Sequence, residues 1–494
     1  GDFTVAALEV GGSAQLGVEG NLAGVSANTV LNVGGNLSLE TKGDIGQNVA
    51  TASPSLLNLK LGGTLSGNAG GAMGIRQHGG NLVFDSLYSG DRMRIDVLDG
   101  SLLSASSSLV TLRSEKGGVE LTARDHIRAL DGGSLNLQLD SDKLDGVAGG
   151  EVRISSPRNA LNIGSLVSGN DMLIGSVSDL TATLLRSGGA LYADAKGSMR
   201  IGSAESEDDV ALSTNGDLSV DNVLSNNGDA SIVAGGGVDI GDVQAASVLL
   251  DAGDVLQLRA GGKVLGDSIV ARANSLDMGN GARMQAASAL SVDTQGDMTL
   301  GQLQVTGING AGTLALTSGG GIVGNGDGQV NLVSGNGVQV AIDAQTGIGQ
   351  AGDRLTFDGG VVNASTQTGD AQLSFVSSAQ IGAIEAHAGG IDLIGSADVS
   401  FDRLQAAGDV RVDAASLQGG DINAGGNVNA NTRTSGAMDV YSVVAGAGMQ
   451  LAAGGALSAN LLQSNSGMTL SSGDTLDVQQ LISGDRLDVE AVGK

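Results

Sequence analysis

Apolar and polar residues alternate along the whole chain in short stretches, and glycine separates each stretch from the next. In the stretch 216–220 (GDLSV), Leu218 and Val220 point to one side of an extended backbone and Ser219 points to the other, as in a β-strand. The same pattern returns at 296–300 (GDMTL) and at 408–412 (GDVRV). The glycine-broken segments cannot supply the apolar spacing of a helix, so the pattern predicts short strands throughout.

A second pattern, two apolar residues around a polar one and then glycine, occurs at Met199–Gly202, Val238–Gly241 and Leu276–Gly279. Successive patterns return after roughly 20 residues, with a half-step near 10, and such a period indicates a solenoid. The spacing of leucine-rich repeats is absent. We therefore predict an all-β parallel β-helix of about 20 residues per coil, in which each coil has two or three short strands. Glycine and asparagine, as at Asn215-Gly216, are expected to supply positive φ angles at the corners.

The pattern marks no domain boundary, so we expect one continuous β-helix through residues 1–494, of about 25 coils. The period is least regular over about 113–158, where we expect coils with a few longer corner loops. Further loops are predicted at Ser53-Pro54 and at 325–328 (NGDG). Because the chain starts and stops within the pattern, we interpret it as a piece of a longer protein.

The composition limits which residue types can form the core and which class of partner is expected. The chain has 83 glycines, no cysteine and no tryptophan, and 41% of its residues are hydrophobic although only 2% are aromatic. The core is therefore expected to be aliphatic, and disulfide and thiol chemistry are excluded. The formal net charge of −28 argues against nucleic acid or an anionic membrane surface as partner. No apolar run is long enough for membrane insertion.

Candidate chemistry is sparse. The acidic stretch 205–209 (ESEDD) could hold Ca²⁺, but we favour a solvated loop. The stretch 319–328 resembles one copy of a calcium-binding nonapeptide, which needs tandem copies to form its site. Three histidines are too dispersed to predict a metal site, and 235–237 (GGG) lacks the context of a phosphate-binding loop. The histidines are His78, His126 and His387.

Aligned coils would stack Asp239 and Asp277 on one face, as a catalytic β-helix requires, although outward aspartates also keep strands from aggregating. The isolated tyrosines Tyr88, Tyr192 and Tyr441 do not form a platform for sugar rings, so a carbohydrate contact would rely on Asn, Asp, Ser and Thr. We predict no enzyme: no catalytic residue, no cofactor-binding residue or cofactor, and no metal ligand.

The stretches 33–46 (VGGNLSLETKGDIG), 424–442 (AGGNVNANTRTSGAMDVYS) and 452–478 (AAGGALSANLLQSNSGMTLSSGDTLDV) resemble the repeat shaft of filamentous-haemagglutinin-like exoproteins, the passengers of bacterial two-partner secretion. The resemblance implies a single-stranded right-handed parallel β-helix (β-solenoid), secretion through an outer-membrane transporter, and adhesion at the bacterial cell surface. The Asn-Pro-rich secretion domain and the Arg-Gly-Asp tripeptide of that family are absent from this sequence.

These expectations lead to a structural and adhesive rod segment of a secreted bacterial surface exoprotein, which mediates attachment to cells, matrix or host, as in a biofilm. Its expected partners are an exopolysaccharide or a ligand on a host or neighbouring cell. The outer-membrane two-partner-secretion transporter would act through a domain not in this chain. The alternatives are the stalk of a contact-dependent toxin-delivery exoprotein and a polysaccharide-degrading β-helix enzyme.

Overall fold

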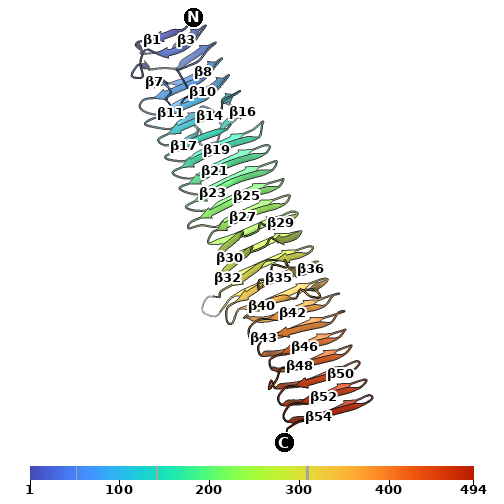
Figure 1. Cartoon of the computed structure of the whole chain (residues 1–494). Coiled ribbons are helices and arrows are strands. Elements are labelled where there is room, and N and C mark those ends of the chain that lie inside the picture. The colour runs from blue at the N-terminus through green and yellow to red at the C-terminus, as the bar shows by residue number, and fades with distance from the viewer. Residues whose placement is uncertain (50, 52, 141–142, 308–310, 494) are drawn as a thin grey trace. The chain divides into compact units, whose positions relative to one another are not determined.

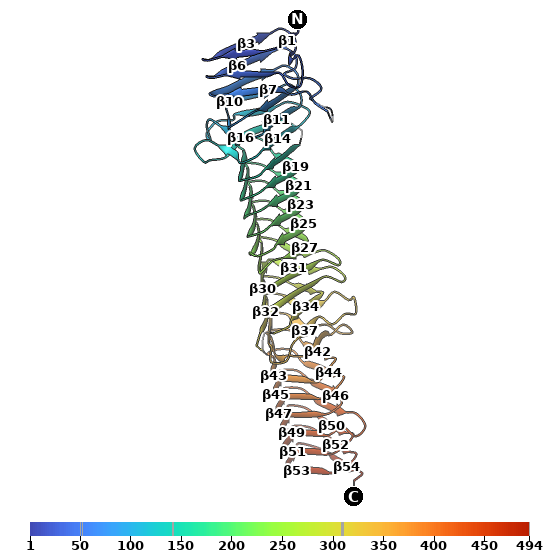
Figure 2. The same ribbon diagram turned by 90° about the vertical axis from the view of Figure 1, so that its left-hand side faces the viewer.

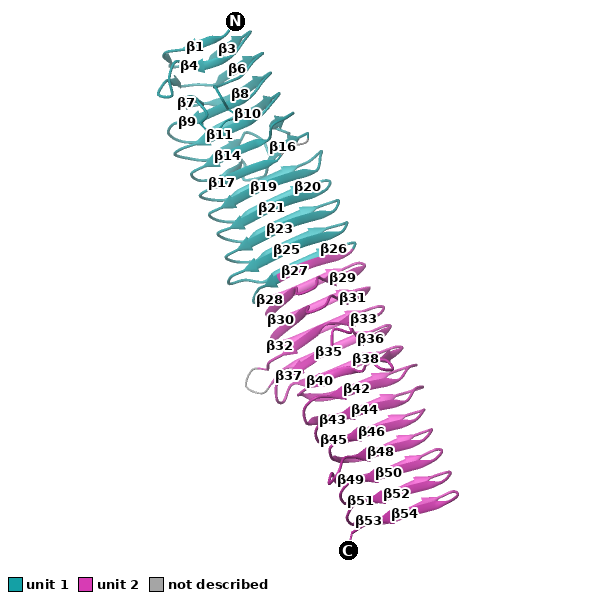
Figure 3. Cartoon of the chain, in the orientation of Figure 1, with its two compact units in different colours: residues 1–236, 243–246 teal, residues 237–242, 247–494 magenta. Residues whose placement is uncertain are grey.

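The computed structural model describes residues 1–49, 51, 53–140, 143–307 and 311–493 (Figure 1). These residues form 54 strands and no helix. Contacts divide the chain into two compact units, 1–236 with 243–246, and 237–242 with 247–494, which Figure 3 colours separately. Each unit is by itself a stack of parallel strands, and the two together contain about 24 coils. The expectation of one continuous domain stays a prediction.

The regular coils of unit 1 confirm the predicted parallel β-solenoid. A long strand and a short strand alternate in each coil. In the long strands, Leu161 lies opposite Leu180 and Leu180 opposite Met199, so each coil takes about 20 residues. The strands of these coils are β19 (Leu161–Ser168), β20 (Met172–Ser176), β21 (Leu180–Ser187), β22 (Leu191–Ala195), β23 (Met199–Ser206) and β24 (Val210–Thr214).

A phase shift in the alternation bends each long strand. The first, third, sixth and eighth side chains are buried, and the fourth and fifth both face outward. In β19 the pairing with β21 skips Gly164, which therefore marks a corner. Each coil thus has three short extended segments around a narrow core, within the predicted range of two or three.

The core is mainly aliphatic, as predicted, but it also accepts phenylalanine rings. Phe357 and Phe375 are buried on successive coils and stack with ring centroids 5.0 Å apart. Phe401 is also buried, and the next coil carries Gly419 on the same face, where a Cβ would lie 2.3 Å from the ring. A ring therefore fits this core either by stacking on a ring of the next coil, as Phe357 does, or where the next coil carries glycine, as at Gly419.

Close packing of successive coils, not backbone conformation, requires most corner glycines. The predicted positive φ is wrong for Asn215 and Gly216, and among the described residues Asn48 and Ser435 are the only non-glycine positions that have it. At Gly188 a Cβ would lie 2.3 Å from the carbonyl oxygen of Gly169 on the preceding coil. Any side chain there would push the coils apart, so the glycines follow the coil period.

Serines at the ends of the long strands point into the stack. The hydroxyl of Ser206 donates to the carbonyl oxygen of Gly189 at 2.6 Å, in the turn of the preceding coil. Ser225 donates to Asp208 in the same way, also at 2.6 Å. The sequence pattern did not separate these inward serines from outward ones. The buried serines of this row in unit 1 are Ser168, Ser187, Ser206 and Ser225.

The predicted irregular region, 113–158, keeps its strands in the stack. β14 (Val119–Ala123) pairs with β11 (Met93–Val97) and with β17 (Leu144–Ala148), and β16 (Leu135–Leu139) also forms. Residues 141–142 of the region lie outside the described residues. Longer coils also occur elsewhere: Thr313 lies opposite Gln339 in unit 2. Figure 2 shows the loops near β16 and near β34 (Gln302–Val305) and β37 (Leu332–Ser334) extending beyond the turns of the regular coils.

Candidate functional site

The carboxylates of the acidic stretch 205–209 do not converge. Glu205 forms an ion pair with Arg186 on the preceding coil, with Nη2–Oε2 at 2.6 Å. Asp209 accepts the backbone N–H of Asp229 at 2.9 Å. Within the described residues, no group of three or more His, Cys, Asp or Glu side chains is placed to hold a metal ion. The favoured interpretation, a solvated loop, holds for the exposed residues 207–209, but it is wrong for Glu205 and Ser206, which end β23, where Ser206 is buried.

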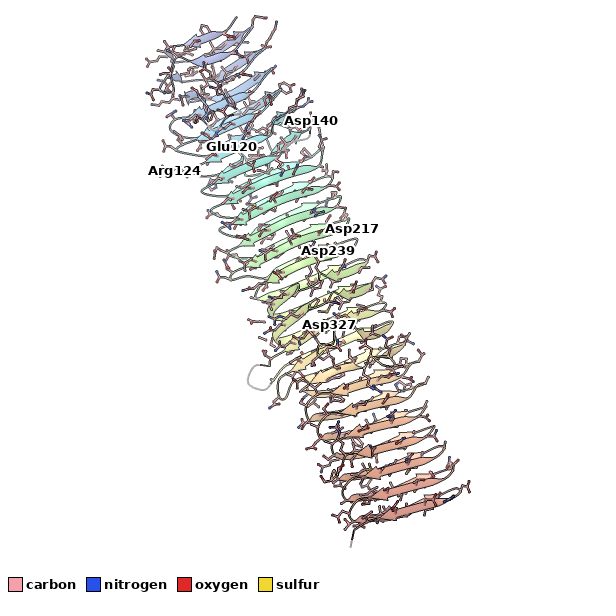
Figure 4. All side chains as sticks on the ribbon, viewed as in Figure 1. Glu120, Arg124, Asp140, Asp217, Asp239 and Asp327 are labelled. Carbon is pink, nitrogen blue, oxygen red and sulfur yellow. The ribbon has the colours of Figure 1, made fainter. Side chains whose placement is uncertain are left out.

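The stretch 319–328 contains β36 (Gly321–Gly324) and, after it, a loop that reaches across the stack. Asp327, labelled in Figure 4, accepts the backbone N–H of Gly281 at 3.0 Å, and Asn325 donates to the carbonyl oxygen of Gly279 at 3.1 Å. Burial raises the pKa of Asp327, but hydrogen bonds from Gly281, Gln329 and Asn325 outweigh it, and the pKa is lowered. The loop that was predicted here exists, and its aspartate fastens it to earlier coils.

The three histidines lie apart and have separate contacts. His78 Nε2 is 3.0 Å from Oδ1 of Asn58, and His126 Nδ1 accepts the backbone N–H of Glu151 at 2.9 Å. His387 Nε2 lies 3.8 Å from Glu385 Oε2. The contacts of His78 and His126 tie strands and turns together.

Asp239 and Asp277 do share one outward row in unit 2, separated by Gln257 on the coil between them. Asp239 receives two hydrogen bonds of 2.8 Å from the guanidinium of Arg259. The row is therefore aligned as the sequence predicted. The ion pair between Asp239 and Arg259 joins two successive coils.

The aspartates of the Gly-Asp patterns have a second role that the sequence reading missed. Asp297 accepts the backbone N–H of Gly321 at 2.8 Å, and Asp409 accepts that of Asn427 at 2.6 Å. Each bond joins one coil to the turn of the next. The acidic side chains at these turns therefore link one coil to the next. Gly235 and Gly236 occupy a bend after β26 (Ala230–Ala234), as predicted for turn glycines.

Arginines of unit 1 are engaged in an ion-pair ladder on one face. Arg76 Nη2 lies 2.8 Å from Asp96 Oδ2, and Arg94 and Arg92 each place an Nη2 atom 3.3 Å from Glu120. The ladder spans β9 (Met73–Gln77), β11 and β14. Because opposite charges on successive coils attract each other, these arginines help to hold the coils together.

The three tyrosines occupy different environments. Tyr88 lies under the guanidinium of Arg113, 5.7 Å from the ring centroid, and its hydrogen bond with Glu115 raises its pKa. Tyr192 is 43% exposed, and Tyr441 is 62% exposed. Tyr441 lines a hollow on the outside of unit 2.

A polar groove follows the outward side of five consecutive long strands in unit 2. One hollow of about 620 Å³ and a second of about 630 Å³ share Gln380, Ser400 and Gln418, so they are continuous. The groove therefore crosses successive coils rather than lying within one. The strands are β43 (Ala379–Ala386), β45 (Val399–Ala406), β47 (Leu417–Ala424), β49 (Met438–Ala445) and β51 (Leu457–Ser464).

The floor of the polar groove is one row of side chains in register. Among the described residues, the side chains of Gln380, Gln418 and Asp439 form no hydrogen bond within the chain. Polar side chains thus succeed one another at the strand spacing of ~4.8 Å, with the amides of Gln380 and Gln418 two coils apart and Asp439 on the coil after Gln418. The row consists of Gln380, Ser400, Gln418, Asp439 and Ser458.

One wall of the polar groove is the corner row of the same strands. Tyr441 stands in this row, and the corresponding residue of the preceding coil is Gly420. A Cβ at Gly420 would lie 2.2 Å from the carbonyl oxygen of Asp402, so the position must remain glycine. The exposed tyrosine ring therefore borders open space on the groove side.

The polar groove is acidic. Asp398, Asp402 and Asp439 line it, and no lysine or arginine is among its described lining residues. The nearby Arg403 is paired with Glu385. The site therefore presents hydrogen-bond acceptors and amides without a cation.

Comparisons with known proteins give no relative. No family model matches the chain, no curated protein matches it, and no solved structure matches it. The described ranges contain no apolar helix of membrane-spanning length.

Proposed function

We propose that the chain is a structural and adhesive segment of a secreted bacterial surface exoprotein, similar to the shafts of two-partner secretion passengers. The supporting observation is the polar groove: amide, hydroxyl and carboxylate side chains succeed one another from coil to coil on an outward face, and within the described residues those of Gln380, Gln418 and Asp439 form no hydrogen bond. Other side chains, at the turns and in the buried serine row, already join the coils. The side chains of the polar groove are therefore available for attachment.

In this proposal a cell-surface or matrix polymer is the partner, and an outer-membrane transporter exports the protein through a domain not in this chain. The adhesive role requires only that the outward rows contact another surface while the inner rows hold the stack. The strands of a coil pair with those of the two neighbouring coils, so variation of the outward residues leaves the stack intact.

The test is aggregation of beads coated with the full chain, mixed with bacterial cells or with matrix polysaccharide. We expect coated beads to aggregate and uncoated beads to remain dispersed. Dispersed coated beads, with no cell or polymer retained on them, would contradict the adhesive role and leave only a spacer.

A further inference from the structure

We propose that the polar groove binds one uncharged glycan chain, which lies across the strands in the direction of coil stacking. The inference deepens the adhesive function proposed above and rests on it for its biological meaning. It names the chemical class of the partner and the residues that recognise it.

The repeat of the floor suits a polymer. Gln380, Ser400 and Gln418 succeed one another in register, so equivalent positions recur on every coil. A ligand that follows this row must also present polar groups repeatedly along its length. Amide groups both donate and accept, and carboxylates accept from hydroxyls, which matches the hydroxyl groups of a sugar chain.

Tyr441 supplies the apolar contact that a sugar ring needs. Its ring is 62% exposed and lines the groove, and Gly420 on the preceding coil leaves the adjacent corner position without a side chain. An aromatic side chain gives a rigid apolar face with a polar tip. One pyranose ring can therefore pack against Tyr441 while its neighbours along the chain contact the floor.

The charge of the groove restricts the ligand. Three carboxylates line it, and its described lining holds no basic side chain. An anionic polysaccharide would meet like charges and find no cation to pair with. The formal charge of −28 on the whole chain opposes anionic ligands further.

The backbone of the groove disfavours an extended peptide. A peptide that adds to a sheet needs a strand edge with free N–H and C=O groups. Each strand from β43 to β51 is paired on both sides, as in β45, which pairs with β43 and β47. Recognition must therefore proceed through side chains, and their spacing suits a glycan.

The experiment measures binding of the full chain to defined hexasaccharides by titration calorimetry. The uncharged probes are cellohexaose, laminarihexaose and maltohexaose, the anionic probe is hexagalacturonate, and the cationic probe is a chitosan hexamer. We expect at least one uncharged probe to bind, and Tyr441→Ala to weaken its binding about tenfold. Gln418→Ala is expected to weaken it as well, since one floor amide is lost.

Tyr192→Ala is the matched control, because Tyr192 is an exposed tyrosine on unit 1 and should leave binding unchanged. Circular dichroism of each variant checks that it folds. Three results would overturn the inference: no uncharged probe binding below about 1 mM, hexagalacturonate or chitosan binding best, or an equal loss in Tyr192→Ala and Tyr441→Ala. Release of new reducing ends from a bound probe would also overturn it, in favour of a polysaccharide-degrading enzyme.

Failure of this inference can be separated from failure of the proposed function. If coated beads aggregate cells while every hexasaccharide fails to bind, the adhesive role stands and the partner is of another class. If a hexasaccharide binds at Tyr441 while the beads stay dispersed, the glycan site stands and adhesion fails.

Discussion

Long strands of the two units have the same inner pattern and different outer rows. In β21 of unit 1 and in β43 of unit 2, the first, third, sixth and eighth side chains are buried. Outside, the first outward row of unit 1 contains Thr181 and Arg200, whereas that of unit 2 contains Gln380 and Gln418. The inner residues therefore determine the coil, and the outer residues are free to acquire a binding surface.

The comparison predicts the largest effects for inner positions. Leu185 is fully buried in β21, and Leu185→Ala should lower local stability by about 2–5 kcal/mol, because the removed side chain leaves a cavity. Leu404 is equally buried in β45 of unit 2, and Leu404→Ala should lose a similar amount. Hydrogen exchange of the strand amides measures both losses, since coils open locally in repeat proteins.

Thr181→Ala is the outer control for Leu185→Ala, because Thr181 is exposed on the same strand. Its effect should stay within about 0.5 kcal/mol. A loss at Thr181 as large as that at Leu185 would end the distinction between inner and outer rows.

The second prediction compares an inward serine with an outward one. Ser206→Ala should cost about 1–3 kcal/mol, because the buried carbonyl oxygen of Gly189 loses its 2.6 Å hydrogen bond. Ser458→Ala, in the floor of the polar groove, should leave stability nearly unchanged. Urea unfolding midpoints of the two variants test the contrast, and equal midpoints would show that the buried serine row contributes nothing.

The third prediction concerns pH and the loop that crosses coils of unit 2. The pKa of Asp327 is lowered in the folded protein, so its carboxylate stabilises the fold above the ordinary aspartate pKa. That contribution is lost as the pH falls through the lowered pKa, when the group takes up a proton.

Asp327→Asn should therefore reduce stability at neutral pH and flatten its dependence below about pH 4. Asp277→Asn, in an outward row of the same unit, is the control and should preserve the acid dependence of the parent. Thermal unfolding midpoints between neutral and acidic pH decide the matter. An unchanged acid profile in Asp327→Asn would show that the carboxylate does not fasten the loop.

Much of the fold could be predicted from the sequence, because burial of alternate side chains acts locally. Leu218 and Val220 are buried in β25 (Leu218–Ser225), as the alternation predicts, and Asp239 and Asp277 share a row as the period implies. The period could not show which serines point inward. Ser206 and Ser458 are the same residue type, and they differ only in their position in the long strand: Ser206 is the eighth residue of β23 and Ser458 is the second residue of β51.

The polar groove was not predicted, because its members are separated by whole coils. Tyr441 is isolated along the sequence, but in space it lines the same hollow as Gly420 and Gln418. An exact alignment of coils would have been needed to place Gly420 beside Tyr441. Variable turn lengths hide that alignment: Leu417 lies opposite Val399 on the preceding coil and Met438 on the next, at unequal separations along the chain.

The smallest predicted effect is on an outer ion pair. Arg186 is exposed and contacts Glu205 at 2.6 Å, so Arg186→Gln should cost less than about 1 kcal/mol, and less still at high salt because exposed charges are screened. Urea unfolding at low and high salt measures this, with Thr181→Ala as a neutral reference. A loss above that of Ser206→Ala would mean that outer charges hold the coils together as strongly as the buried hydroxyls. The outer rows would then be constrained by stability, and the free variation from which the polar groove is inferred would no longer hold.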